Sequence, residues 1–168
     1  MKNILSRFFL ILGIFLILYA SFLFWKRINP WRLSFSNYKP VTTQNKTKLI
    51  PQRLKIKSLK IDLPIIPQQI NKNVWETTEN GVSYLKNTHY ILYGHNWQNL
   101  LGNLTKAKPK MNIEIEFNDK SVKKFAVINT LEVSPNQNKI PYDEKNQILI
   151  IYTCTGFFDE KRFVVTAR

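Results

Sequence analysis

Three residues in the second half of the chain have side chains that could together break and remake an amide bond. Cys154 is the only cysteine, and it stands in the segment IIYTCTGFFDEKRFVV. Arg162 follows in the same segment, and His95 stands in YGHNW. A cysteine nucleophile needs an imidazole that takes the thiol proton and later protonates the leaving amine. A fixed arginine can stabilise the developing oxyanion. These residue types predict thiol-dependent acyl transfer, provided that the fold brings them together.

Cys154 and Arg162 also have ordinary structural interpretations. A lone cysteine is more often a small buried core residue than a nucleophile, and Arg162 could simply pair with Asp159 or Glu160. Two features favour a catalytic role for these two residues. Cys154 directly follows an apolar run, where we expect a strand to end, and Arg162 begins the next apolar run. If those strands are neighbours, the turn between them returns the guanidinium to the thiol.

His95 has a competitor in His89, the other histidine of the chain. His89 begins HYILY, a short apolar run typical of a strand, and His95 follows the Gly94 that ends it. We expect His95 to be functional and His89 to be structural or exposed, because they lie at opposite ends of this strand. One cysteine and two histidines do not favour a structural zinc site.

Short apolar or alternating runs separated by turn signals surround these residues. They lie at 54–63, 89–93, 111–117, 122–133, 148–152 and 162–166. The run at 148–152 is continuously apolar, as expected for a strand buried on both faces. Gln98–Lys106 has the spacing of one or two helical turns. The pattern predicts an all-β fold of about seven or eight strands, either a barrel or a sandwich, with minor helix.

The N-terminal part of the chain has a different organisation. Phe8–Trp25 contains no charged residue and approaches the length that spans a bilayer. This run is longer than the core of a signal peptide, and its only pair of small residues lies inside it, which favours an uncleaved anchor. We expect a charged flank at 1–7, a transmembrane helix at 8–25, a basic stalk at 26–53 and one domain at 54–168.

The formal net charge of +14 is concentrated beside the expected anchor. Ten basic residues lie from Lys26 to Lys60, and the first acidic residue of the chain is Asp62. Such a segment would be attracted to anionic lipid or to an acidic wall polymer. The positive-inside rule alone would place the domain in the cytoplasm, because only Lys2 and Arg7 precede the apolar run.

Three segments together resemble the sortase family. ILYGHNW, IIYTC and RFVV stand in the order, and near the spacing, of three sortase motifs: a Gly-His after a mid-domain strand, a Thr-Cys at the end of a late strand and an Arg in the final strand. LKIKSLKIDLPI is similar to the first strand of the family, and VWETTENGVSYL to the segment before the histidine. The resemblance covers Leu54–Arg168. Ile150 and Ile151 depart from the Thr-Leu that commonly precedes the x-Thr-Cys of the family.

The resemblance implies a closed sortase-type β-barrel of about eight strands and a role for each site residue. Cys154 would attack the peptide bond of an LPXTG-like sorting motif, and His95 would act as acid and base. Arg162 would hold the substrate and the oxyanion, and Thr153 would help to shape the oxyanion site. The short loop between Cys154 and Arg162 contributes to substrate choice in the family, so the motif itself is left open.

The resemblance also implies partners and a location. The substrates would be proteins with a sorting signal, and the acceptor an amine on a peptidoglycan precursor or a pilin subunit. The protein would cross the cell membrane once and carry its catalytic domain on the extracellular face, against the charge count. Some sortases bind calcium, but Glu114, Glu116 and Asp119 form no ligand set that we would carry over. We therefore expect neither cofactor nor metal.

Two other functions compete with a transpeptidase. A catalytically inactive, membrane-tethered sortase-like module would bind a sorting peptide without forming a thioester, and the intact Cys, His and Arg count against it. A basic membrane-tethered binder of nucleic acid or anionic polymer would use the segment from Lys26 to Lys60. The chain carries no nucleic-acid motif, so we expect no nucleic-acid partner.

Overall fold

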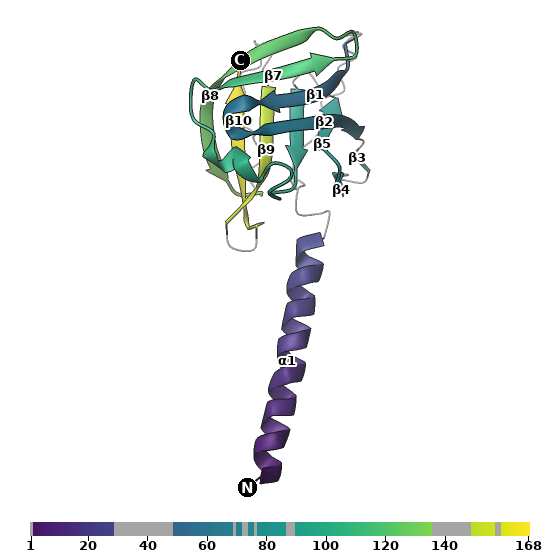
Figure 1. Cartoon of the computed structure of the whole chain (residues 1–168), viewed down its shortest axis with the longest axis vertical. Helices are drawn as coiled ribbons and strands as arrows, with labels where there is room; N and C mark the ends of the chain where they lie inside the picture. The colour runs from purple at the N-terminus through teal and green to yellow at the C-terminus, as the bar shows by residue number, and fades with distance from the viewer. Residues whose placement is uncertain are drawn as a thin grey trace.

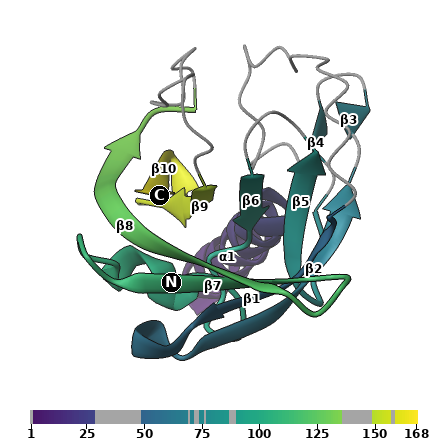
Figure 2. The same ribbon diagram turned by 90° about the horizontal axis from the view of Figure 1, so that it is seen from above.

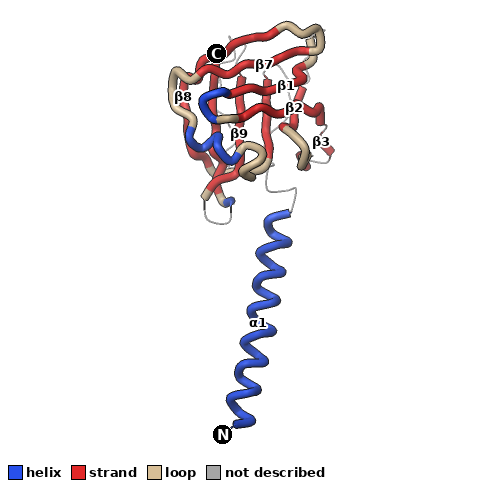
Figure 3. The backbone as a smooth tube through the Cα atoms, in the orientation of Figure 1, coloured by secondary structure: helices blue, strands red, loops and turns tan. Residues whose placement is uncertain are grey.

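The computed structural model describes residues 2–28, 49–68, 70–71, 74–75, 77–86, 90–135, 149–156 and 159–168. These residues form a long helix, a closed barrel of eight strands, a separate pair of very short strands and two short 3-10 helices. Figure 3 shows that strands make up most of the folded domain. The predicted closed barrel with minor helix is confirmed, and the barrel rather than the sandwich is the correct all-β alternative.

The helix α1 runs from Lys2 to Ile28, so it extends beyond the predicted 8–25 at both ends (Figure 1). Its stretch Ser6–Trp25 has 20 residues and a mean hydropathy of 2.5. At about 1.5 Å per residue, such a stretch matches the roughly 30 Å hydrocarbon core of a bilayer. The large apolar side chains along it are exposed. By length and composition, this helix can cross a membrane. Most of the predicted stalk, 29–48, lies outside the described residues.

The eight barrel strands follow one another in the order β1-β2-β5-β6-β9-β10-β8-β7, and β7 closes the ring against β1. Two neighbouring pairs are parallel, β2 with β5 and β6 with β9, and the other pairs are antiparallel. The strands are β1 (Pro51–Ile56), β2 (Ile61–Gln68), β5 (Val82–Lys86), β6 (Tyr90–Gly94), β7 (Asn112–Phe117), β8 (Val122–Val133), β9 (Leu149–Thr155) and β10 (Lys161–Ala167).

The described residues also form two short strands and two 3-10 helices outside the order of the barrel strands. The two short strands β3 (Ile70–Asn71) and β4 (Val74–Trp75) pair with each other. The 3-10 helices are η2 (Lys57–Leu59) and η3 (Gly102–Lys106), and η3 lies at the end of the predicted helical segment. Strand β8 is long and curved, so that it pairs first with β7 and then with β10 (Figure 2).

Buried apolar side chains form two clusters, one on each face of the β6–β9–β10 wall. The larger cluster draws residues from all eight strands and fills the barrel. The smaller cluster lies on the opposite face, because alternate residues of a strand point to opposite sides. In β9, Ile151 belongs to the first cluster, and Ile150, Tyr152 and Cys154 belong to the second. The predicted burial of this strand on both faces is therefore confirmed.

Gly81 lies where β2 and β5 approach each other closely, at the start of their parallel pairing. A Cβ at Gly81 would lie 2.5 Å from the backbone oxygen of Pro64, far inside van der Waals contact. We expect Gly81→Ala to lower the free energy of unfolding of the barrel by about 1–3 kcal/mol. Gly13→Ala is the matched control, because a Cβ there meets nothing within 4 Å. Urea unfolding of the full chain in detergent micelles measures both, and equal midpoints for the two variants would contradict the packing.

Candidate active site

The pairing of β9 with its two neighbours brings the predicted site residues together. In the antiparallel pair of β9 and β10, Cys154 lies directly opposite Arg162. In the parallel pair of β6 and β9, Gly94 lies opposite Thr153. His95 directly follows Gly94 in one segment, and Cys154 directly follows Thr153 in the other. The register therefore places Cys154 and Arg162 on paired positions of β9 and β10, with His95 directly after the end of the neighbouring β6.

Side-chain alternation shows which face of the wall carries these groups. Tyr93 and Tyr152 precede His95 and Cys154 by two residues each, and their rings stack with centroids 5.6 Å apart. Trp75 of β4 packs its ring edge-on against both tyrosines, at 5.2 and 5.9 Å. Residues two apart in a strand share a face. Cys154, and Arg162 opposite it, therefore stand on the outer face of the barrel, beside a buried aromatic floor.

Cys154, the single cysteine of the chain, is only 4% exposed and lies within the outer cluster. We predicted that the strand ends before Cys154. The structure corrects this, because β9 continues through Cys154 to Thr155. The extra pairs with β10, Arg162 with Cys154 and Lys161 with Thr155, explain the difference. The thiol is thus held by a paired strand rather than by a loop, which fixes its position more tightly.

Arg162 is buried in the site, at 2% exposure. Its Nη1 donates to the backbone carbonyls of Asp159 and Lys161, both at 3.1 Å. The structure therefore gives Arg162 the main-chain oxygen of Asp159 as a partner. Its Nε is buried and has no hydrogen-bond partner among the described residues. A buried charged donor left in that state is unfavourable, so this N–H is available to an acceptor that enters the site.

Thr153 has a fully buried hydroxyl that ties two strands together. Its Oγ1 donates to the carbonyl oxygen of Gly94 at 2.8 Å, across the β6–β9 boundary. This bond lies immediately before Cys154 on one strand and immediately before His95 on the other. The sequence indicated Thr153 only through the family resemblance, and the spatial partner of its hydroxyl could not be read from the chain.

His95 is partly exposed and sits at the start of the loop that leads to η3. Its ring stacks on Trp97 with centroids 4.5 Å apart and planes at 10°. Its carbonyl oxygen accepts a hydrogen bond from the amide of Leu101 at 3.2 Å. The competing imidazole, His89, lies outside the described residues. The structure thus describes His95, whose ring packs on Trp97 directly after the end of β6.

Sequence reasoning missed the aromatic residues Trp75, Tyr93, Tyr152 and Trp97. A signal for the tyrosines was present, because ILYGH and IIYTC each place a tyrosine two residues before the reactive group. That spacing puts both on the same face as the site. Trp75 and Trp97 gave no such signal, since their contacts depend on how β4 and the loop after β6 fold.

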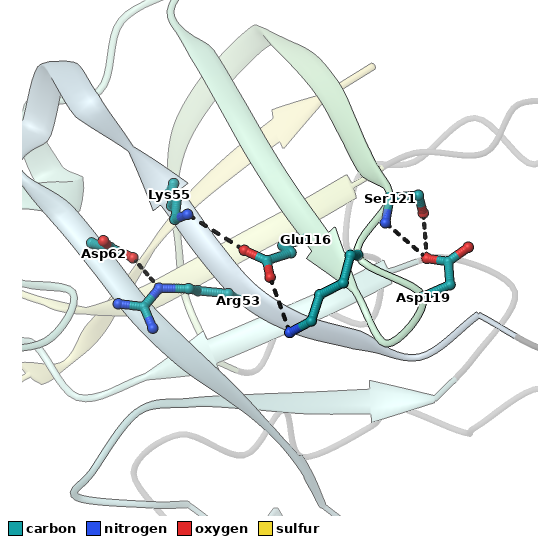
Figure 4. Close-up of polar contacts among 7 residues, drawn as sticks. Arg53, Lys55, Asp62, Glu116, Asp119 and Ser121 are labelled. Carbon is teal, nitrogen blue, oxygen red and sulfur yellow. Dashed lines mark hydrogen bonds and ion pairs between the residues drawn. The ribbon is translucent and has the colours of Figure 1, made fainter.

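The acidic residues considered for calcium are engaged with other partners, and Figure 4 draws those of Glu116 and Asp119. Glu116 pairs with Lys55 at 3.4 Å and with Lys120 at 3.6 Å, and Glu114 pairs with Lys57 at 3.7 Å. Within the described part of the chain, no group of three or more Asp, Glu, His or Cys side chains could hold a metal ion.

Asp119, the third of these residues, and Asp62 are held by close hydrogen bonds, also drawn in Figure 4. Asp119 accepts hydrogen bonds from the hydroxyl and amide of Ser121, and these lower its pKa. The hydrogen bond from Arg53 likewise lowers the pKa of Asp62. Both side chains are therefore kept as carboxylates by local contacts.

The fold and the site define a closed-barrel protein with a cysteine-centred site. The family model described as Sortase domain matches residues 54–168, and the chain belongs to the sortase family. A search of curated proteins found no match.

Solved structures of sortases share the fold. Sortase C1 from Streptococcus agalactiae, in its complex with MTSET, is 21% identical with a TM-score of 0.60, and the match covers 70% of this chain but only 65% of that chain. A lid mutant of sortase A from Corynebacterium diphtheriae is 21% identical with a TM-score of 0.60, over 74% of this chain and 72% of that chain. Sortase C from Clostridium perfringens is 18% identical with a TM-score of 0.57, over 70% and 68%. At these identities the likeness concerns the fold alone.

The hydrogen bond between Thr153 and Gly94 can be tested with two substitutions. Thr153→Val keeps the shape but removes the hydroxyl, so the Gly94 carbonyl loses a buried donor. We expect this variant to lose about 1 kcal/mol of unfolding free energy. Thr153→Ser keeps the donor and should retain most of that stability. Urea unfolding of the full chain in detergent micelles measures both. Unchanged stability in Thr153→Val, or an equal loss in both variants, would contradict a structural role for the bond.

Proposed function

We propose that this protein is a membrane-anchored cysteine transpeptidase that acts on proteins carrying an LPXTG-like sorting signal. The observation that carries the proposal is the register of β9, which sets Cys154 opposite Arg162 and Thr153 opposite Gly94. Membership of the sortase family supports the same chemistry. Each of the three reactive types therefore has a position from which it can serve one reaction centre.

In the first step, the thiol proton of Cys154 passes to His95, and the sulfur attacks the carbonyl carbon of the scissile peptide bond. The oxyanion that develops is stabilised by the Arg162 guanidinium, whose buried Nε lacks a partner among the described residues. The C–N bond then breaks, and His95 gives its proton to the leaving amine. The products of this step are a thioester on Cys154 and a free amine on the departing segment.

In the second step, an amine of a peptidoglycan precursor or of a pilin subunit attacks the thioester. His95 takes the proton of the attacking amine, and the sulfur of Cys154 leaves. One amide bond replaces another, so the reaction needs no oxidant or reductant. Thr153 contributes through its bond to Gly94, which holds the strand ends in register around the oxyanion site. The closely packed outer cluster supports a site from which water is largely excluded.

The N-terminal helix supports a single-pass membrane location. Its apolar surface from Ser6 to Trp25 is exposed and has bilayer length. We propose that 8–25 form the anchor, that 26–53 form a basic stalk, and that the domain at 54–168 lies on the extracellular face. Sortases are cell-surface enzymes, and this outweighs the basic residues beyond the helix. The basic stalk would then face anionic head groups or wall polymer.

One observation favours a second candidate function, a sortase-like module that binds sorting peptides without cleaving them. Cys154 is 4% exposed, and a nucleophile must be reached by its substrate. In such a module the buried thiol would be a core residue of the outer cluster. The two candidates differ in one product, the thioester.

Trapping the acyl-enzyme separates them. The full chain in detergent micelles is incubated with a small library of fluorogenic LPXTG-like peptides plus an amine acceptor, quenched, and measured by intact mass. We expect a peptide-sized adduct on the wild type and none on Cys154→Ala. Peptide binding that is equal in wild type and Cys154→Ala, with no adduct from any peptide, would assign the chain to the binding module.

Substitutions of the other site residues sharpen this experiment. We expect His95→Ala to slow turnover by at least about 100-fold, because it removes the general acid and base. His89→Ala is the matched control and should keep near wild-type turnover; the reverse result would move the role to His89.

Arg162→Lys should lose most activity, because a point charge does not replace a planar fork of donors. Full activity in that variant would remove Arg162 from the mechanism.

A further inference from the structure

The aromatic contact of the site histidine lies outside the roles described so far. The ring of His95 lies almost parallel to the indole of Trp97, with centroids 4.5 Å apart and planes at 10°. The face of an indole carries negative electrostatic potential and attracts a cation within about 6 Å of the ring centre. A protonated imidazole at this distance is therefore favoured more by the indole than a neutral one.

Hydrogen bonds hold this stack in place. The carbonyl oxygen of Trp97 accepts from the amides of Leu100 at 2.9 Å and Gly102 at 2.8 Å, and that of His95 accepts from the amide of Leu101 at 3.2 Å. Leu101 is completely buried in the barrel core. Both members of the stack are thus attached, through one turn, to the packed interior, and the stack is preorganised rather than a surface encounter.

Gly102, which closes this turn, leaves no room for a side chain. A Cβ at Gly102 would lie 2.7 Å from the carbonyl oxygen of Trp97 and 2.9 Å from its carbonyl carbon. A side chain at this position would push the Trp97 backbone away. The close approach of Gly102 is therefore part of what places the indole under His95.

We propose that Trp97 is a positioning residue that fixes the ring of His95 and favours its protonated form. The inference rests on the proposed function, in which His95 must carry the proton that the leaving amine receives. Trp97 touches neither thiol nor substrate in this account. It acts through His95, by keeping a larger share of the imidazole protonated at neutral pH and by restricting the ring to one orientation.

Other charged and titratable groups also face His95 from the elements around it, and the test must separate their effects from that of Trp97. Cys154 of β9 lies on the strand next to β6, and Arg162 lies opposite it on β10, one strand further away. Among the described residues, charged groups on neighbouring segments include Glu79 in the turn before β5 and Lys106 in η3. Replacing the thiol by Ala removes one of these, and the others are common to every Trp97 variant.

An NMR titration of the His95 imidazole measures the effect without relying on activity. The full chain, labelled with ¹³C-histidine, is titrated in detergent micelles in a Cys154→Ala background. Because the chain has two histidines, His89→Gln leaves a single signal. We expect Trp97→Leu to lower the titration midpoint by about half a pH unit, the size of an exposed cation–π contact. Trp97→Phe, which keeps a weaker aromatic face, should fall between the two.

The order of the midpoints decides the inference. A purely steric support would give Trp97→Leu and Trp97→Phe the same midpoint as the wild type, and that result overturns the proposal. The Phe variant keeps the test valid if the Leu variant does not fold, because a midpoint in Trp97→Phe that is no lower than in the wild type also overturns it.

The rate of acyl-enzyme formation gives a second readout in proteins that retain Cys154. A lowered proton affinity of His95 removes a larger fraction of its protonated form at pH 8 than at pH 6. Trp97→Leu should therefore lose more rate at the higher pH, whereas damage to the fold would lower both rates by the same factor, against the proposal. A lowered NMR midpoint in a chain that forms no acyl-enzyme supports the effect of Trp97 on His95 and rejects the transpeptidase instead.

Discussion

The register of β9 between β6 and β10 is the constraint on which the site depends. His95 comes from a segment far along the chain from the one that holds Cys154 and Arg162, and no local motif holds the three together. Backbone pairing does so, with Cys154 opposite Arg162 on one side and Thr153 opposite Gly94 on the other. A slip of one residue would turn every side chain of β9 to the other face and would bury the thiol in the barrel. The hydroxyl of Thr153 adds a side-chain bond across the β6–β9 boundary.

The closed barrel explains why this register is stable. Strand β9 is apolar on both faces, one packed in the barrel core and the other against Trp75 and Tyr93. Its neighbours on both sides are themselves paired, so β9 has no free edge. The same burial surrounds the guanidinium of Arg162 with little water and leaves its Nε available. Electrostatic stabilisation of an oxyanion is stronger in such surroundings than in water.

Much of this architecture could be predicted from the chain, and the exceptions have a common physical origin. Alternation and apolar runs identified the strands that carry Cys154 and Arg162, because those patterns are local. The run at 148–152 did not indicate that β9 continues through Cys154, since the added residues are polar or small and are held by pairing with β10. We predicted helical turns over Gln98–Lys106, and the helix in the structure is the shorter 3-10 helix η3, Gly102–Lys106. The stack of Trp97 on His95 depends on turn hydrogen bonds that leave no trace in composition.

The central claim is that backbone register places an imidazole where it activates the thiol, and the reaction rate of that thiol tests it most directly. The chain has a single cysteine, so alkylation by iodoacetamide reports on Cys154 alone. The rate is measured at pH 7 on the full chain in detergent micelles, for the wild type and for His95→Ala. Because the thiolate is the reactive form, the account predicts at least about a tenfold slower reaction in His95→Ala. Equal rates in the two proteins would contradict it.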